Sequence, residues 1–243
     1  LDMIKVCLIG YGKWGKLLFK KLDKISIVIK ILDSKNYSLK NLVNCDWVVI
    51  ATPNKTHYKI VKDCLKLKKN IVCEKPLVPR YTQALELYNL AEKNGVKIFV
   101  SDFTDYKKKI EFKKENIFQR FKNSKNNFSL KNKRFDLLYD LAYHDISYIY
   151  KFTYLKKINL IKIISSKSIL KFIIKFKNHN FLFHYDNLKS KKIYTLNKTS
   201  LYQRKDIIKK MFCDYFYKKK SYIFNKKKSL FIIRLLEKIK NEI

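Results

Sequence analysis

Three of the four glycines in this 243-residue chain lie within six positions, between an apolar run and a segment of helical periodicity. The apolar run, residues 4–9, predicts a buried strand, and residues 16–22 predict the helix that follows it. The six positions read Gly10-Tyr11-Gly12-Lys13-Trp14-Gly15, a Gly-x-Gly-x-x-Gly turn. Such glycines permit a tight turn, close approach of the backbone to a pyrophosphate, and close packing of helix on strand. The turn therefore predicts a dinucleotide site that includes Gly10, Gly12, Lys13, Trp14 and Gly15.

An acidic residue stands near the place where a dinucleotide-binding fold needs one. The next apolar run, residues 25–32, ends at Asp33, which lies 23 positions after Gly10. A carboxylate near this spacing hydrogen-bonds the ribose of NAD, although a turn aspartate that caps the following segment is the alternative. Ser34 and Lys35 follow and suit a 2′-phosphate. We therefore expect NAD as the cofactor and keep NADP as the alternative.

Strands and helices then alternate as far as residue 103. Apolar runs predict strands at residues 47–51, 70–73 and 96–100. Helical periodicity predicts helices at residues 55–69 and 80–93. This alternation is typical of a parallel sheet with right-handed crossovers, whose ligands bind outside the carboxyl ends of the strands. We therefore expect an α/β chain that begins with a Rossmann-type, doubly wound domain over residues 1–103.

The pattern changes after residue 103. A segment at 110–118 predicts a helix, and the polar residues 122–133 predict a mobile loop. Short strand-like runs follow, and residues 229–239 predict a closing amphipathic helix. The expected strands are 160–165, 169–176, 180–185 and 192–196, with a hairpin turn at 177–180. We therefore expect residues 104–243 to form an α+β domain with an antiparallel sheet.

Two blocks downstream of the glycine turn carry a family resemblance. The first joins Ala51-Thr52-Pro53-Asn54-x-x-His57 to Glu74-Lys75-Pro76-Leu77, each block beginning at the end of a predicted strand. The second covers residues 135–147 and contains Asp140 and His144, four positions apart. In this order the motifs resemble the Gfo/Idh/MocA oxidoreductases, which include glucose–fructose oxidoreductase and inositol dehydrogenase. The second block is similar to the members that act on nucleotide-linked amino sugars.

The resemblance covers residues 3–101 and 135–150 and implies a function. It implies an NAD(P)-dependent oxidoreductase that transfers a hydride between the cofactor and a carbinol of a sugar or nucleotide sugar. It also implies two groups of site residues. The cofactor group extends the glycine turn and Asp33 with Ala51, Thr52, Pro53, Asn54, His57, Glu74, Lys75 and Pro76. The catalytic group is Lys75, Asp140 and His144.

The chemistry of these side chains supports the catalytic roles. On a helix, Asp140 and His144 share one face, and a carboxylate beside an imidazole orients its tautomer and raises its basicity. Lys75 follows a strand at the expected cofactor crevice, where an ammonium can hydrogen-bond a reacting hydroxyl. A cis Lys75–Pro76 bond would fix the direction of this lysine. The alternatives are an ordinary i, i+4 surface pair and an ordinary solvated lysine.

The net charge of +35 suggests nucleic acid at first sight. However, only five basic residues are arginine, the preferred base-reading residue, and the lysines are spread along the chain. We therefore expect no specific nucleic-acid partner. The five cysteines show no metal-binding spacing, so we expect no metal and a reduced, cytoplasmic protein. With neither a signal peptide nor a membrane span in the sequence, we expect no membrane partner.

The chain departs from the family in length. Members are usually longer, which predicts an internally trimmed second domain. The sheet of that domain commonly pairs with another subunit in the family, and the apolar stripe at 169–176 suits such a homo-oligomer or a core. The alternative to the oxidoreductase is a non-catalytic dinucleotide-binding or basic binding protein that descends from the family.

Overall fold

The computed structural model describes most of the chain, and its contacts group the residues into two compact units. The described residues are 3–33, 37–107, 110–121, 137–153, 159–166, 169–186, 193–201, 207–218 and 222–243. The first unit comprises Leu1–Tyr106 and Asp206–Ile233, and the second comprises Lys107–Lys205 and Arg234–Ile243. The expected division into domains at residues 1–103 and 104–243 stays a prediction. Ser34, Lys35 and the expected loop at 122–133 lie outside the described residues.

The first unit is built on a five-stranded parallel sheet with the strand order β2-β1-β3-β4-β5. Its strands are β1 (Lys5–Ile9), β2 (Ile27–Leu32), β3 (Trp47–Ile50), β4 (Asn70–Glu74) and β5 (Ile98–Ser101). Its first helices are α1 (Lys13–Leu22), η1 (Leu39–Leu42), α2 (Asn54–Lys66), α3 (Tyr81–Lys93) and η2 (Phe103–Tyr106), of which η1 and η2 are 3₁₀ turns. The parallel sheet of the prediction is confirmed. Because the chain leaves β1 toward β2 and returns to β3 on the other side, the ligand crevice is expected beyond β1 and β3.

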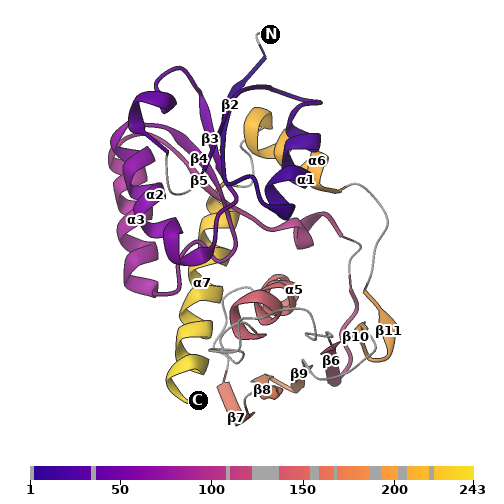
Figure 1. Cartoon of the computed structure of the whole chain (residues 1–243). Helices are drawn as coiled ribbons and strands as arrows, with labels where there is room; N and C mark the ends of the chain where they lie inside the picture. Colours follow the sequence, from indigo (N-terminus) through magenta and orange to yellow (C-terminus); the bar gives the residue numbers. More distant parts are fainter. Residues whose placement is uncertain are drawn as a thin grey trace. The chain divides into compact units, whose positions relative to one another are not determined.

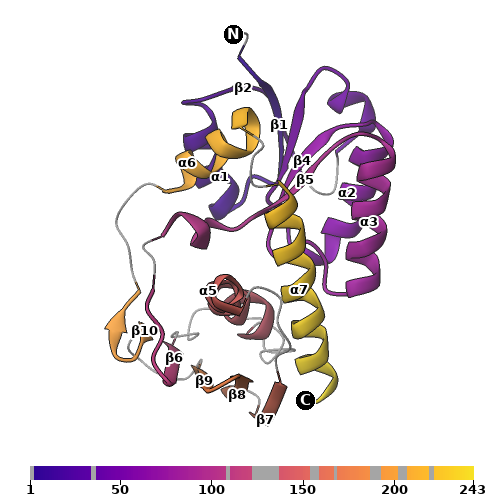
Figure 2. The same ribbon diagram turned by 180° about the vertical axis from the view of Figure 1, so that it is seen from behind.

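Helices cover both faces of this sheet (Figures 1 and 2). One face carries α2 and α3, and the other carries α1 and α6 (Ile207–Cys213). A π-helical turn, η4 (Asp214–Lys218), follows α6, and α7 (Tyr222–Asn241) begins in the first unit and ends in the second. Among the residues that the structure describes, no helix is long and apolar enough to cross a membrane.

The π-helical turn η4, near the C-terminal end of the chain, contributes aromatic side chains to the core of the first unit. The ring centroids of Phe99 and Tyr215 lie 4.4 Å apart, and those of Trp47 and Phe216 lie 5.0 Å apart. All four side chains are buried. The aromatic-rich run near residue 212 therefore packs on a sheet formed more than a hundred residues earlier, which local periodicity does not predict.

The second unit is built on a six-stranded sheet with the order β11-β10-β6-β9-β8-β7. Its strands are β6 (Glu115–Phe121), β7 (Asn159–Ser165), β8 (Ile169–Phe176), β9 (His179–Asp186), β10 (Ile193–Leu196) and β11 (Thr199–Ser200). The pairs are antiparallel except that β6 and β9 run parallel. The predicted helix at 110–118 is wrong: Asn116 and Phe118 are buried in alternation with exposed neighbours, the period of a strand.

One face of this sheet carries the core of the second unit. A π-helical turn, η3 (Leu137–Ala142), continues directly into α5 (Tyr143–Thr153). On the sheet, Phe118, Phe172 and Phe183 stack across three strands, with ring centroids 5.1 Å and 4.5 Å apart. Tyr148 of α5 stacks on Phe118 with centroids 6.5 Å apart. The apolar stripe of β8 therefore belongs to the core, which was one of its two expected roles.

Candidate active site

The glycine turn between β1 and α1 has the geometry that its sequence demands. Gly10 adopts a φ of +100°, and a Cβ built there would lie 2.6 Å from the carbonyl oxygen of Ala51. A Cβ built on Gly15 would lie 2.0 Å from the carbonyl oxygen of Gly10, so α1 packs directly on the turn. A Cβ on Gly12 meets no described atom within 4 Å. Gly10 and Gly15 thus shape the turn, whereas the space beside Gly12 is open for a ligand.

A cavity of about 940 Å³ opens beside this turn, at the carboxyl ends of β1, β2 and β3. It brings together eight of the predicted cofactor residues: Gly10, Gly12, Lys13, Trp14, Asp33, Ala51, Thr52 and Pro53. Four lining residues were not predicted: Tyr11, Ile31, Leu32 and Asn41. Ile31 and Leu32 end the strand that precedes Asp33, so the sequence pattern could have predicted their place at the cavity. Asn41 belongs to no motif that would have predicted its place.

The residues of the cavity fit a dinucleotide. Helix α1 begins after Gly12 with no side chain capping its first N–H groups and no acidic residue in its first turn. Those N–H groups and the positive end of the helix dipole suit a pyrophosphate. Asp33 is exposed on the cavity wall directly after β2, where its carboxylate can accept hydrogen bonds from ribose hydroxyls. The cavity thus offers donors for phosphate and an acceptor for ribose.

We expect Gly12→Ala to fold like the wild-type protein and to bind NADH at least about tenfold more weakly, since a methyl group there occupies the open cradle. Calorimetric titration measures the affinity, and urea unfolding checks the fold. Wild-type affinity in a folded Gly12→Ala variant would show that no phosphate approaches this turn.

His57 joins the two loops that follow β3 and β4. Its imidazole is buried, with Nε2 lying 2.9 Å from the carbonyl oxygen of Thr52 and Nδ1 lying 2.9 Å from that of Pro76. Thr52 lines the cavity, whereas Pro76 follows the lysine of the Glu-Lys-Pro motif. The contact therefore fixes one loop against the other. His57 is not among the residues that line the cavity, and its predicted role beside the cofactor stays a prediction.

The burial of His57 predicts a dependence of stability on pH. Burial lowers the pKa of this imidazole below its ordinary value of 6.5, although the two carbonyls raise it in part. As the pH falls below about 6.5, the unfolded chain binds a proton that the folded chain does not, so stability decreases by up to about 1.4 kcal/mol per pH unit. We expect His57→Gln to lose this part of the decrease in urea unfolding measured at pH values of about 7 and about 5. An equal decrease in both proteins would contradict the assignment.

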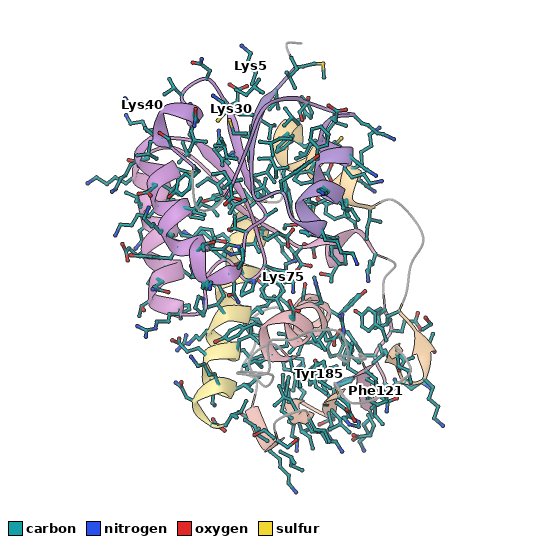
Figure 3. The ribbon with its side chains drawn as sticks, in the orientation of Figure 1. Lys5, Lys30, Lys40, Lys75, Phe121 and Tyr185 are labelled. Carbon is teal, nitrogen blue, oxygen red and sulfur yellow. The ribbon has the colours of Figure 1, made fainter. Side chains whose placement is uncertain are left out.

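The Glu-Lys-Pro motif lies at the carboxyl end of β4 (Figure 3). The Lys75–Pro76 peptide bond is cis, the isomer that would fix the direction of the lysine, and Lys75 is half-buried. Burial raises the pKa of Glu74, while the Trp14 indole and the Ser101 hydroxyl, as hydrogen-bond donors, offset this in part. Glu74 thus connects the end of β4 to the first turn of α1, which borders the cofactor cavity.

Asp140 and His144 lie in the second unit, where η3 continues into α5. Asp140 is exposed on the π-helical turn, and His144, only 8% exposed, lies in the first turn of α5. The expected i, i+4 spacing therefore spans a change of helical pitch, a feature that is frequent at functional sites. Asn54 begins α2 directly after Pro53, beside the cavity. Within the described ranges, no group of three or more His, Cys, Asp or Glu side chains is placed to hold a metal ion.

Comparison with known proteins supports this interpretation of the cavity. The family described as "Oxidoreductase family, NAD-binding Rossmann fold" (GFO_IDH_MocA) matches residues 24–102. The uncharacterized oxidoreductase C115.03 of Schizosaccharomyces pombe is 41% identical over 76 residues, which are 28% of this chain and 21% of that protein. The chain therefore matches about a fifth of the length of this curated relative.

Two solved structures share the fold across nearly the whole chain. UDP-N-acetylglucosamine 3-dehydrogenase GnnA from Acidithiobacillus ferrooxidans has a TM-score of 0.83 at 12% identity, covering 100% of this chain and 98% of that one. The WlbA dehydrogenase from Thermus thermophilus, in complex with NAD and UDP-GlcNAcA, has a TM-score of 0.74 at 12% identity, covering 97% and 94%. The predicted family and the predicted NAD cofactor are confirmed. Residues 24–102 of this chain match the NAD-binding Rossmann fold of the Gfo/Idh/MocA oxidoreductase family.

Proposed function

We propose that this protein is an NAD-dependent oxidoreductase that transfers a hydride between the cofactor and a carbinol carbon of a nucleotide-linked amino sugar, with NADP as the alternative cofactor. The observation that carries the proposal is the cavity at the glycine turn, which has an uncapped helix N-terminus at one wall and Asp33 at another. Lys75 follows β4, two strands from β1 at the same carboxyl edge of the sheet. When bound in the cavity, NAD supplies the hydride acceptor.

Lys75 is proposed to act on the oxygen of the substrate carbinol. An ammonium that donates a hydrogen bond to this oxygen stabilises alkoxide character as the carbonyl forms. The position of Lys75 supports this role. The cis bond to Pro76 and the contact between Pro76 and His57 fix the backbone at Lys75. The side chain of Lys75 is half-buried, which reduces its exposure to competing water.

His144 is proposed as the general base that removes the proton of the same hydroxyl, with Asp140 orienting the imidazole. Alcohol oxidation releases a proton as the hydride leaves, so a base must lie within hydrogen-bond reach of the hydroxyl. An imidazole is suited to this role near neutral pH because its ordinary pKa is about 6.5. The roles of Lys75 and His144 can be exchanged, since a desolvated lysine also serves as a base.

The substrate class follows from the resemblance of the residue 135–147 block and from the similar structures. GnnA is named as a UDP-N-acetylglucosamine 3-dehydrogenase, and WlbA was solved with UDP-GlcNAcA. Both share the fold of this chain at low identity, so they favour this substrate class as a proposal.

The proposal is tested by incubating the protein with NAD⁺ or NADP⁺ and either UDP-N-acetylglucosamine or its uronic acid, while following nicotinamide absorbance. Reduction of NAD⁺ that depends on one of these sugars, and that is lost in Lys75→Met, is the expected result. Tight NADH binding without turnover of any nucleotide sugar would favour the non-catalytic alternative. Turnover of free sugars alone would leave the oxidoreductase in place and overturn the nucleotide-sugar substrate.

A further inference from the structure

Next to His144 stands a carboxylate that the proposed mechanism does not use. Asp145, in the first turn of α5, is completely buried, and the side chain of its partner Arg120 is only 13% exposed. Arg120 donates from Nη2 at 2.9 Å and from Nε at 3.1 Å to Oδ1 of Asp145. Tyr185 donates from its hydroxyl at 3.1 Å to Oδ2. Both oxygens of Asp145 are therefore held by side chains of the sheet.

The two residues that hold Asp145 come from neighbouring strands, and a third strand packs against one of them. Arg120 of β6 lies opposite Tyr185 of β9 and opposite Tyr194 of β10. The guanidinium of Arg120 stacks on the ring of Tyr194, 3.6 Å from its centroid. Side chains directly opposite each other share one face of a sheet. Figure 3 labels Tyr185 on β9 and Phe121, the residue after Arg120 on the neighbouring strand β6. Two strands thus hold the carboxylate, and Tyr194 of the third packs against the arginine that binds it.

A buried ion pair is a costly way to hold a helix on a sheet. Desolvation of both charges offsets much of their attraction, and apolar side chains of similar volume often stabilise a fold equally well. Such side chains are already present in this interface, as in the stacked rings of Phe118, Phe172 and Phe183. Unlike apolar packing, the ion pair fixes the orientation of the helix, because two nitrogens of Arg120 and the hydroxyl of Tyr185 must all donate to one carboxylate.

From this juxtaposition we infer that Asp145, held by Arg120 and Tyr185, is a positioning residue that fixes the rotation of the first turn of α5 and with it the direction of His144. The inference rests on the proposed role of His144. A helix places successive side chains about 100° apart, so fixing Asp145 against the sheet directs the preceding residue away from it. Such a device has a purpose here because η3, a π-helical segment with more residues per turn than an α-helix, ends at Ala142, two residues before His144.

The test separates position from stability. The double variant Arg120→Met/Asp145→Leu replaces the ion pair by apolar groups, and Ile149→Val removes a methylene from a fully buried position of the same helix. Urea unfolding measures the stability of each protein. The imidazole NMR signals of labelled histidine report the environment of His144, which His144→Gln identifies among the four histidines. The rate of nucleotide-sugar oxidation measures the consequence for turnover.

We expect the double variant to unfold at the wild-type urea concentration or above, with the His144 signal shifted and broadened and turnover reduced roughly a hundredfold at unchanged NAD affinity. Ile149→Val should unfold earlier with an unchanged His144 signal. A wild-type His144 signal in the folded double variant overturns the inference, whatever the turnover. If the double variant fails to fold, Asp145→Asn gives the same readout. A wild-type protein that shows no turnover defeats the proposed function alone, because the NMR signal still decides the positioning role.

Discussion

We expect Lys75→Met to lower turnover by roughly two to four orders of magnitude and to leave NADH binding nearly intact. Methionine keeps the bulk of the side chain and removes the ammonium that stabilises the developing alkoxide. His144→Ala should lower turnover on the same scale, since it removes the proposed base. Asp140→Asn should cost less, because the imidazole stays and only its orientation and charge support weaken. Single-turnover hydride transfer measures each effect.

Lys93→Met is the matched control for charge. Lys93 is exposed in the last turn of α3, so its loss removes one positive charge without touching the site. We expect wild-type turnover from it. Near-wild-type rates in both Lys75→Met and His144→Ala would show that neither side chain performs the proton chemistry.

Lys228→Met is expected to destabilise the first unit by about 3–5 kcal/mol, the cost of leaving a buried charge without its partner. Lys228 of α7 is 1% exposed, and its Nζ lies 2.8 Å from Oδ2 of the fully buried Asp102. It also donates to Asp105. Although burial lowers the pKa of this lysine, the two carboxylates raise it above its ordinary value. Chemical unfolding of the full chain, followed by tryptophan fluorescence, measures the loss.

Lys226→Met tests the same helix without a buried charge. Its partner Glu92 is 51% exposed, so we expect a change below about 1 kcal/mol. The double variant Lys228→Met/Asp102→Asn should recover part of the stability lost in Lys228→Met, since it no longer buries an unpaired carboxylate. If Lys228→Met and Lys226→Met were equally stable, the role assigned to Lys228 would be contradicted.

The sequence predicts the parallel sheet and most of the cofactor cavity because both depend on local backbone requirements. Gly10 and Gly15 are required by contacts within the turn and with the residue after the neighbouring strand, so their spacing between a predicted strand and a predicted helix indicates the turn. Asp33 follows from the length of one strand and one helix. Asn41 could not be predicted in the same way, because it reaches the cavity from a 3₁₀ turn that carries no motif.

Contacts between distant segments are the part that the sequence does not reveal. Lys228 is one of 55 basic residues, and nothing local marks it as the buried partner of Asp102. Likewise Arg120 meets Asp145 only because β6 pairs in parallel with β9, and the segment leading into β6 has the periodicity of a helix on sequence alone. In each case tertiary packing decides the outcome, and local propensity is a weak guide to it.

The most direct test of the account is calorimetric titration of the purified protein with NADH and, separately, with NADPH. The cavity at the glycine turn and the carboxylate of Asp33 predict saturable binding of NADH well below millimolar concentration, with NADPH bound more weakly. A preference for NADPH would change only the role of Asp33. Failure of both dinucleotides to bind at millimolar concentration would contradict the central claim that this chain is a dinucleotide-dependent oxidoreductase.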